Sequence, residues 1–539
     1  MRNIFLSLSR CCSLVAVLSV AGQLFAQSPD GVAKNWHLQA VASGTPGISL
    51  SGAYAVVKGL PAKKVIVAVI DNGVDIDHED LREVIWVNSD EIPGNGRDDD
   101  GNGYVDDVYG WNFLGNASGE NVHYDNLEMT RIYAHLSKRF AGKALTDIAP
   151  KDKPDFERYQ EYGKEIEDKV AEYASNYQLY GVLDATIDTI IAVKGSMDLS
   201  KDELLSVEID HPGVMRFRQP LAGVMEAEGW TFAELAKQIE ESFEYFYARY
   251  NFYYNPEWNS RALIGDDPNN PKEIGYGNPD VKGPDPFHGT HAAGVIAAVR
   301  NNDLGMDGVA DQVQIMAIRA VPDGDEHDKD VANAIRYAVD NGASIINLSF
   351  GKGASPLKGV VDAAVRYAEK KDVLIVHSAG NDAKENKPDG QFPNDQYQKA
   401  GFLAPKQAKN WIEVGASGPE MNEQLAASFT NYSSVHVDIL APGVSIYSTY
   451  PNNSYDWLDG TSFSAPVVSG VAALIRAYFP GLRAKEVREI LLESAYKPGI
   501  QVMLPGSEDA KVALSDLCAT GGLVDAKAAL ELARARANN

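Results

Sequence analysis

Short, almost continuous apolar runs recur along the chain and are separated by polar, glycine-containing segments. Amphipathic helical patterns lie between these runs, for example at 330–342 and 359–371. The runs themselves are short and rich in β-branched residues, which is typical of parallel strands buried on both faces. The pattern predicts an α/β fold with a parallel sheet covered by helices on both sides, and sites in such folds lie at the carboxyl ends of the strands. The predicted strands are KVIVAVI (64–70), VQIMAIRA (313–320), SIINLS (344–349), VLIVHS (373–378) and VDILA (437–441).

A central region breaks this alternation. Between about residues 116 and 283 no strong strand run occurs, and long polar helical patterns take its place. Thr231 and Glu234 have the spacing of a capping box, which predicts the start of the last of these helices. Aromatic and aliphatic residues recur at helical spacing through 232–246 and predict packing between helices. We therefore expect a mainly helical insertion at 116–283 within a domain formed by 27–115 and 284–539.

The N-terminus has the features of an export signal. Arg2 and Arg10 flank an early apolar patch, and SLVAVLSVAGQLFA (13–26) follows. A membrane anchor is the alternative, but this stretch is too short to span a bilayer comfortably and no stop-transfer pattern follows it. We predict a signal peptide at 1–26, no membrane-spanning segment after its removal, and a periplasmic or extracellular location. Cys518 would then be the only cysteine left, so stability must come from something other than an internal disulfide.

The charge balance narrows the possible partners. The formal net charge is -26 and the pI is about 4.8. Nucleic acid is disfavoured as a partner because phosphate contacts need a basic face. An anionic membrane surface is disfavoured for the same reason. A cationic substrate is compatible with this charge, although acidity alone is weak evidence for one.

Three motifs contain residues that could act together in catalysis. Asp71 ends the first predicted strand, His288 begins the small-residue helical stretch HGTHAAGVIAA, and Ser462 begins another one, SFSAPVVSGVAALIRAYF. A helix N-terminus disfavours a protonated His288 and would stabilise an oxyanion that forms beside Ser462. The three side chains could meet at one edge of the sheet. Ser462 would then attack a carbonyl, His288 would transfer the proton, and Asp71 would orient His288.

These motifs resemble those of subtilisin-like serine proteases, the subtilase or peptidase S8 family. VIDNGVD, HGTHAAG and GTSFSAP match its three active-site motifs in order, and the resemblance covers about 36–115 and 284–535. It implies a three-layer subtilisin-like fold and a triad of Asp71, His288 and Ser462. HSAGND places Asn381 where the family has its side-chain oxyanion donor. The implied activity is hydrolysis of polypeptides by a serine endopeptidase through an acyl-enzyme; the alternative is a catalytically silent peptide-binding protein that uses the same cleft.

The resemblance also indicates where a substrate would bind. NLSFG (347–351) resembles the strand to which the family's substrates pair, so Ser349, Phe350, Gly351 and Gly380 are expected to bind substrate. The acidic loop PDGDEHDKD (322–330) lies where the family shapes its non-primed subsites. Its acids could select basic residues, or the loop could simply be solvated. The insertion could be a lid or exosite near the cleft, or an inert decoration.

Acidic loops point to calcium. In GNGRDDDGNGYVDD (94–107), oxygen ligands at Asp98, Asp100, Asn102 and Asp106 resemble the first half of a calcium loop. Tyr109 stands where an EF-hand has its last glutamate, so this is not an EF-hand, and a solvated acidic turn is the alternative. The family resemblance implies a second calcium site formed by Asp80, Asn302 and Asp303. Bound calcium would stabilise an exported protein that has no disulfide.

Overall fold

The computed structural model describes residues 31–398 and 405–538. The predicted signal peptide at 1–26 lies outside these residues. Among the described residues, no helix has both the length and the apolar character needed to cross a membrane. The described residues form two compact units, one of Met129–Trp258 and one of 31–128 with 259–538.

The larger unit is built on a seven-stranded parallel sheet with the order β2-β3-β1-β4-β5-β6-β7. All five predicted strands are present, as β1, β3, β4, β5 and β7. The sequence pattern did not predict β2, which has three residues, or β6, whose apolar run is interrupted by a glutamate. The strands are β1 (Val65–Asp71), β2 (Gly110–Asn112), β3 (Val313–Arg319), β4 (Ile345–Leu348), β5 (Leu374–Ser378), β6 (Trp411–Ser417) and β7 (Ile439–Pro442).

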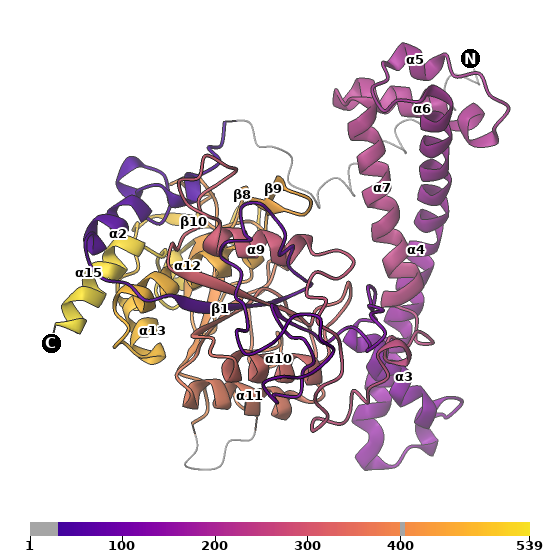
Figure 1. The fold of residues 1–539 in the computed structure, drawn as a ribbon. Helices are drawn as coiled ribbons and strands as arrows, with labels where there is room; N and C mark the ends of the chain where they lie inside the picture. Colours follow the sequence, from indigo (N-terminus) through magenta and orange to yellow (C-terminus); the bar gives the residue numbers. More distant parts are fainter. Residues whose placement is uncertain (1–30, 399–404, 539) are drawn as a thin grey trace. The chain divides into compact units, whose positions relative to one another are not determined.

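Apolar side chains from the sheet pack into two separate layers. In β1, Val67 and Val69 contact the layer that contains α9 (Phe287–Ala297) and α12 (Thr461–Tyr478). Ala68 and Ile70 contact the opposite layer, which contains α10 (Asp328–Asp340) and α11 (Lys358–Lys370). Because successive side chains of a strand point to opposite faces, a strand that is apolar throughout is buried on both sides. Helices cover both faces of the sheet, which confirms the predicted three-layer α/β fold (Figure 1).

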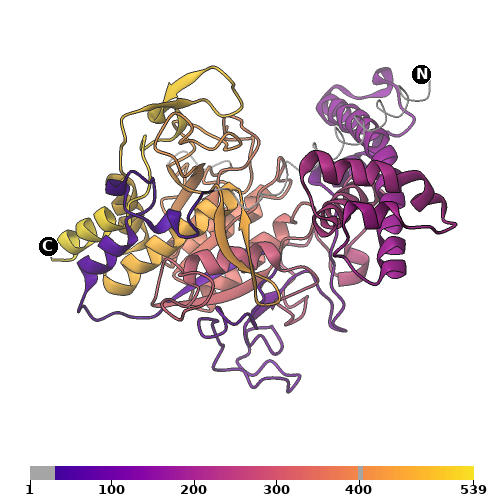
Figure 2. The same ribbon diagram turned by 90° about the horizontal axis from the view of Figure 1, so that it is seen from above.

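Segments from the two ends of the described chain lie side by side in this unit. The yellow helix α15 (Ala526–Ala537) packs against the indigo helix α2 (Leu50–Val57) (Figures 1 and 2). The N–H of Ala526 donates to the carbonyl of Ile48 at 2.9 Å. The remaining elements of the unit are α8 (Arg261–Ile264), the hairpin β8 (Ile446–Tyr450) and β9 (Ser454–Leu458), α13 (Ala484–Glu493), the hairpin β10 (Gln501–Met503) and β11 (Lys511–Ala513), and α14 (Leu514–Leu517).

The smaller unit is helical. The long helix α4 packs along α7, and aromatic rings line this contact, with Tyr180 and Phe246 stacked at 5.2 Å between ring centroids. The predicted capping box opens α7: Thr231 Oγ1 accepts from Glu234 N at 3.2 Å, and Glu234 Oε2 accepts from Thr231 N at 2.7 Å. The predicted helical character of this region is confirmed. Its helices are α3 (Glu128–Phe140), α4 (Lys153–Lys194), α5 (Lys201–Leu205), α6 (Pro212–Glu228) and α7 (Phe232–Ala248).

Candidate active site

Asp71 and His288 meet at the carboxyl end of the sheet. Asp71 is the last residue of β1, and His288 is the second residue of α9. His288 Nδ1 lies 2.7 Å from Asp71 Oδ1, and the aspartate is 1 % exposed. Burial on its own lowers the pKa of His288, but the charge and hydrogen bond of Asp71 outweigh it, so that this pKa is raised. With Nδ1 held by Asp71, Nε2 is the ring nitrogen that can exchange a proton.

Ser462 lies in the first turn of α12. The preceding Gly460 has φ = 152°, a conformation that L side chains rarely adopt, so glycine is needed there. The Ser462 hydroxyl donates to the carbonyl of Ser349 at 3.1 Å. His288 lies beside this segment, with its ring centroid 5.3 Å from that of Phe463. In the described part of the chain no hydrogen bond joins Ser462 to His288, because the serine hydroxyl is directed to the Ser349 carbonyl instead.

Asn381 is tied to the residue before Ser462. Its Oδ1 accepts from both the N–H and the hydroxyl of Thr461, each at 2.9 Å. With its oxygen occupied in this way, the amide retains its N–H groups as donors. The Thr461 hydroxyl in turn accepts from Gly380 N at 3.1 Å. Gly380 has φ = 103°, and a Cβ there would lie 2.4 Å from Asn431 Nδ2, so only glycine fits.

The segment Ser349–Gly351 continues β4 past Ser462. Ser349 Oγ donates to the carbonyl of Ser462 at 2.7 Å. Lys352, at the end of the segment, exchanges two backbone hydrogen bonds with Phe392 at 2.8 and 2.9 Å. Between these two points, within the described residues, no backbone group pairs with the N–H or C=O of Gly351. An unpaired piece of strand edge therefore lies beside Ser462.

Comparison with known proteins agrees with this geometry. The model of the Subtilase family matches residues 62–521. The chain belongs to the subtilase family. That membership places it in the class of subtilisin-like serine endopeptidases, which are hydrolases.

Three relatives show the extent of the likeness. This subtilase is 37% identical over 211 residues to the thermophilic serine proteinase of Bacillus sp. (strain AK1), a match that covers 39% of this chain and 47% of the relative. It is 36% identical over 215 residues to Subtilisin DY of Bacillus licheniformis, a match that covers 39% of this chain and 71% of that relative. It is 38% identical over 211 residues to thermitase of Thermoactinomyces vulgaris, a match that covers 39% of this chain and 67% of that relative. The chain thus matches less than half the length of the first of these relatives.

The acidic loop 322–330 of this subtilase is turned inward. Its acids Glu326, Asp328 and Asp330 are 2 %, 5 % and 0 % exposed. Neither alternative, a solvated loop or a loop that offers its acids to substrate, describes these three carboxyl groups. Asp328 accepts from the Leu357 N–H at 2.7 Å and from the Lys352 ammonium at 2.9 Å.

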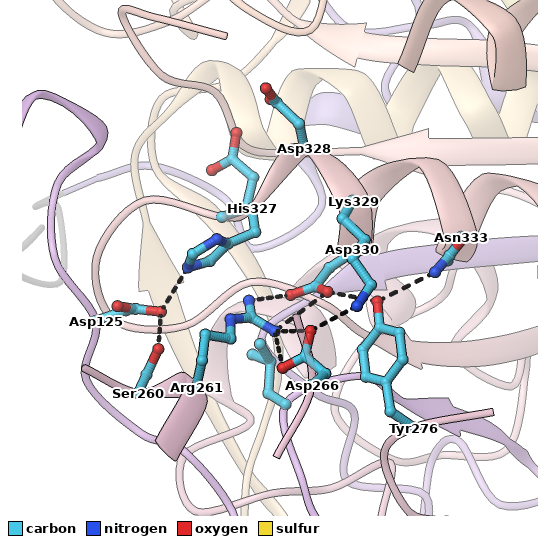
Figure 3. A network of polar contacts seen from close by, with 12 residues as sticks. Asp125, Ser260, Arg261, Asp266, Tyr276, His327, Asp328, Lys329, Asp330 and Asn333 are labelled. Carbon is cyan, nitrogen blue, oxygen red and sulfur yellow. Dashed lines mark hydrogen bonds and ion pairs between the residues drawn. The ribbon is translucent and has the colours of Figure 1, made fainter. Parts of the chain in front are cut away.

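Cations from the same chain neutralise this loop. Figure 3 shows the Arg261 guanidinium between Asp330 and Asp266, both of which it contacts. The Lys329 ammonium lies 2.7 Å from Asp266 Oδ2 and 2.6 Å from Glu273 Oε2. The Lys352 ammonium pairs with Glu128 at 2.7 Å. Lys329 belongs to the loop itself, but Arg261 and Lys352 come from other segments, so the sequence pattern of the loop alone did not reveal them.

A different group of acids could hold a metal. One oxygen each from Glu91, Asp100 and Asp107 lies within 4.8 Å of the others. Glu91 is 6 % exposed, and its Oε2 has no hydrogen-bond partner among the described residues. Burial raises the pKa of Asp107 to about 6. A buried carboxylate oxygen without a partner, next to a second buried carboxyl group, fits a hard cation such as calcium.

The ligands that were predicted for this loop are only partly in that group. Asp100 belongs to it, and the Asn102 amide donates to Asp100 and Asp107 at 3.0 Å each. Asp98 instead accepts from the N–H groups of residues 101–103, and Asp106 from those of residues 95 and 96. Sequence reasoning missed Glu91 because it precedes the loop, and missed Asp107 although it directly follows Asp106.

The second predicted metal group is also incomplete. Asn302 Nδ2 donates to Asp80 Oδ1 at 2.7 Å, and the Tyr455 hydroxyl donates to Asp80 Oδ2 at 3.3 Å. Asp80 is fully buried, and burial raises its pKa. Asp303 is exposed. The structure therefore brings Asp80 and Asn302 together, and an inverted Asn302 amide would present an oxygen beside Asp80.

Proposed function

We propose that this subtilase is an exported endopeptidase that cleaves polypeptides through Ser462, His288 and Asp71. The observation that carries the proposal is the hydrogen bond between His288 and Asp71, formed beside a serine in the first turn of α12. Ser462 attacks the scissile carbonyl while His288 Nε2 takes its proton and then gives it to the leaving amine. Asp71 holds the proton on Nδ1 and stabilises the imidazolium. Water hydrolyses the acyl-enzyme with His288 again acting as base.

Charge that develops on the carbonyl oxygen needs donors. In this proposal the Asn381 amide and the Ser462 N–H supply them, and the N-terminus of α12 adds its positive potential. Ser349, Phe350 and Gly351 form the strand to which the substrate pairs, and Gly380 leaves room for it. An extended peptide would bond to the N–H and C=O of Gly351, which have no backbone partner within the described chain.

Calcium is proposed as a structural cofactor. Glu91, Asp100 and Asp107 form an oxygen-rich group suited to calcium, and Asn102 holds two of these carboxylates in place through its amide N–H groups. Asp80 with Asn302 forms a second, smaller group. A bound calcium ion would offset negative charge in these loops. It takes no part in proton transfer at Ser462.

The organisation of the chain completes the proposal. A signal peptide at 1–26 would direct the protein to the periplasm or the medium. Residues 27–115 and 284–539 would form the peptidase domain, with 116–283 inserted into it. The lid or exosite role of the insertion predicts altered hydrolysis of proteins relative to short peptides when its compact helical unit, 129–258, is deleted. Unchanged relative rates would support a decoration.

Labelling of the serine tests the proposal. The protein without residues 1–26 is incubated with a fluorophosphonate probe and assayed with a peptide substrate, beside Ser462→Ala. We expect the unchanged protein alone to be labelled, and kcat to fall about 10⁶-fold in Ser462→Ala. Absence of labelling together with retained peptide binding would support the alternative, a silent peptide-binding protein.

A further inference from the structure

A histidine side chain, and not a backbone N–H, donates a hydrogen bond to the proposed substrate-pairing segment Ser349–Gly351 on the side that faces β5. The ladder between β4 and β5 ends at the pair Leu348 and His377. Successive carbonyl groups of an extended strand point to opposite sides, so the Phe350 carbonyl points away from the side that Ser349 and Gly351 share. Beyond the end of the ladder it accepts from His377 Nε2 at 2.8 Å. The imidazole therefore replaces a backbone N–H at this point.

A glutamate decides which ring nitrogen carries that proton. His377 Nδ1 lies 2.9 Å from Oε1 and 3.0 Å from Oε2 of Glu413, its neighbour on β6. Glu413 Oε2 also accepts from Trp411 Nε1 at 2.8 Å. Whichever of the two groups holds the shared proton, the other ring nitrogen, Nε2, must be an N–H in order to bond the Phe350 carbonyl. The contact with Glu413 thus fixes the histidine as a donor toward the strand.

The pair is well shielded from water. His377 is 0 % exposed and Glu413 is 6 % exposed. The Trp411 ring lies over the imidazole, with 5.1 Å between the ring centroids. Burial on its own lowers the pKa of His377, but the charge of Glu413 and the hydrogen bonds outweigh it and raise this pKa. The negative charge of the buried Glu326 acts in the same direction.

We propose that His377 and Glu413 are positioning residues that hold Ser349–Gly351 in the register needed to pair with an extended substrate. This inference rests on the proposed endopeptidase function. Neither residue touches the substrate. Loss of the donor would leave the part-buried Phe350 carbonyl without its hydrogen bond, and this favours a shift or rotation of its peptide plane. Such a change would weaken the pairing of long peptides and leave the chemistry at Ser462 intact.

Two amide variants separate positioning from mere structural support. In His377→Asn the amide lies near the position of Nδ1 and retains the contact with Glu413 but does not reach Phe350. In His377→Gln the amide reaches the position of Nε2 and can donate to the Phe350 carbonyl. Each variant is assayed with a tetrapeptide p-nitroanilide and with p-nitrophenyl acetate, which has no residues to pair with the strand.

We expect His377→Asn to lower kcat/KM for the tetrapeptide about tenfold, mainly through KM, as loss of one hydrogen bond would. Its rate with p-nitrophenyl acetate and its fluorophosphonate labelling should stay unchanged. His377→Gln should regain most of the tetrapeptide activity. His37→Asn serves as the matched control, because His37 is also 0 % exposed and, within residues 31–398 and 405–538, neither of its ring nitrogens has a hydrogen-bond partner. Its ratio of peptide to ester activity should equal that of the unchanged protein.

Three outcomes overturn the inference. The first is an unchanged ratio of peptide to ester activity in His377→Asn, and the second is an equal fall in both activities in both amide variants. If His377→Asn does not fold, His377→Phe replaces it in the same assay. The third outcome is then an unchanged ratio of peptide to ester activity in His377→Phe. Failure of the proposed function would look different, because the unchanged protein itself would then not be labelled.

Discussion

Two acidic loops of this subtilase, 322–330 and 91–107, differ in whether cationic side chains offset the negative charge of their carboxylates. The loop 322–330 contains Lys329 and is contacted by Arg261 and Lys352, and these cations pair with its carboxylates or with those next to it. In the loop 91–107 the acids Glu91 and Asp107 are equally buried, but no lysine or arginine of the described chain forms an ion pair with them. The comparison teaches that the number of acids in a loop does not by itself predict a metal site. A metal site is expected where buried acids have no lysine or arginine to pair with.

The largest expected effect comes from removing a built-in cation. Arg261→Met leaves the buried Asp266 and Asp330 without their guanidinium, and breaking a buried pair of this kind costs about 3–5 kcal/mol. We expect a loss of that size in the free energy of unfolding by urea, equal with and without calcium. Arg261→Met with Asp330→Asn should regain part of it. A single variant as stable as the unchanged protein would remove the distinction between the two loops.

The second effect is the response of the loop 91–107 to an external cation. A ligand that binds only the folded protein stabilises it by about 2.7 kcal/mol at a concentration 100 times its Kd. We therefore expect calcium to raise the midpoint of thermal unfolding and a chelator to lower it, with magnesium as the comparison ion. Identical melting curves under all three conditions would mean that this loop is stable without a metal.

A smaller effect separates the observed group of acids from the predicted one. Asp107 belongs to the group of three acids, whereas Asp98 accepts backbone N–H groups as a turn cap. Both are changed to asparagine in an Asp80→Asn background, which removes the second site. Asp107→Asn should abolish the shift that calcium causes in this background. Asp98→Asn should retain the shift and cost less than about 1 kcal/mol at every calcium concentration, because asparagine keeps an oxygen that can accept backbone N–H groups. The reverse result would favour the ligands that the sequence predicted.

The smallest effect concerns an exposed ion pair. Lys201 and Glu226 in the helical unit are 2.8 Å apart, but their side chains are 40% and 69% exposed. Solvent screens such a pair, and many contribute nothing measurable. Lys201→Met should therefore leave the urea unfolding curve unchanged, in contrast to Arg261→Met. A large loss of stability would show that burial is not what separates these cations.

How far the sequence could predict the structure depended on how local each feature was. The hydrogen bond between Asp71 and His288 could be anticipated because each residue lies in a short motif at the end of a strand or the start of a helix. Strand β6 was missed because Glu413 interrupts its apolar run, and that residue proved to be paired with His377.

Features assembled from distant segments could not be predicted in this way. Arg261 reaches Asp330 across 69 residues, and nothing in either segment names the other as its partner. The oxygen atoms near Asp100 likewise come from Glu91 and Asp107, while the regularly spaced Asp98 and Asp106 bond to the backbone of their own turn. The spacing of acidic residues predicts a local turn well. Which of their oxygens lie close enough together to bind one metal ion depends on the tertiary structure.

The backbone bridge between Lys352 and Phe392 has a further consequence if the proposed function holds. Because backbone groups alternate along an extended strand, this bridge lies on the side of the Phe350 carbonyl. It holds the end of Ser349–Gly351 in place and leaves the side of Gly351 open to a target chain in extended form. Helices and closed hairpins in a target would have to open before they could be cut. The rate of cleavage at many sites would then follow how often the target unravels locally. The protease would therefore cleave unfolded or locally unfolded targets faster than stably folded ones.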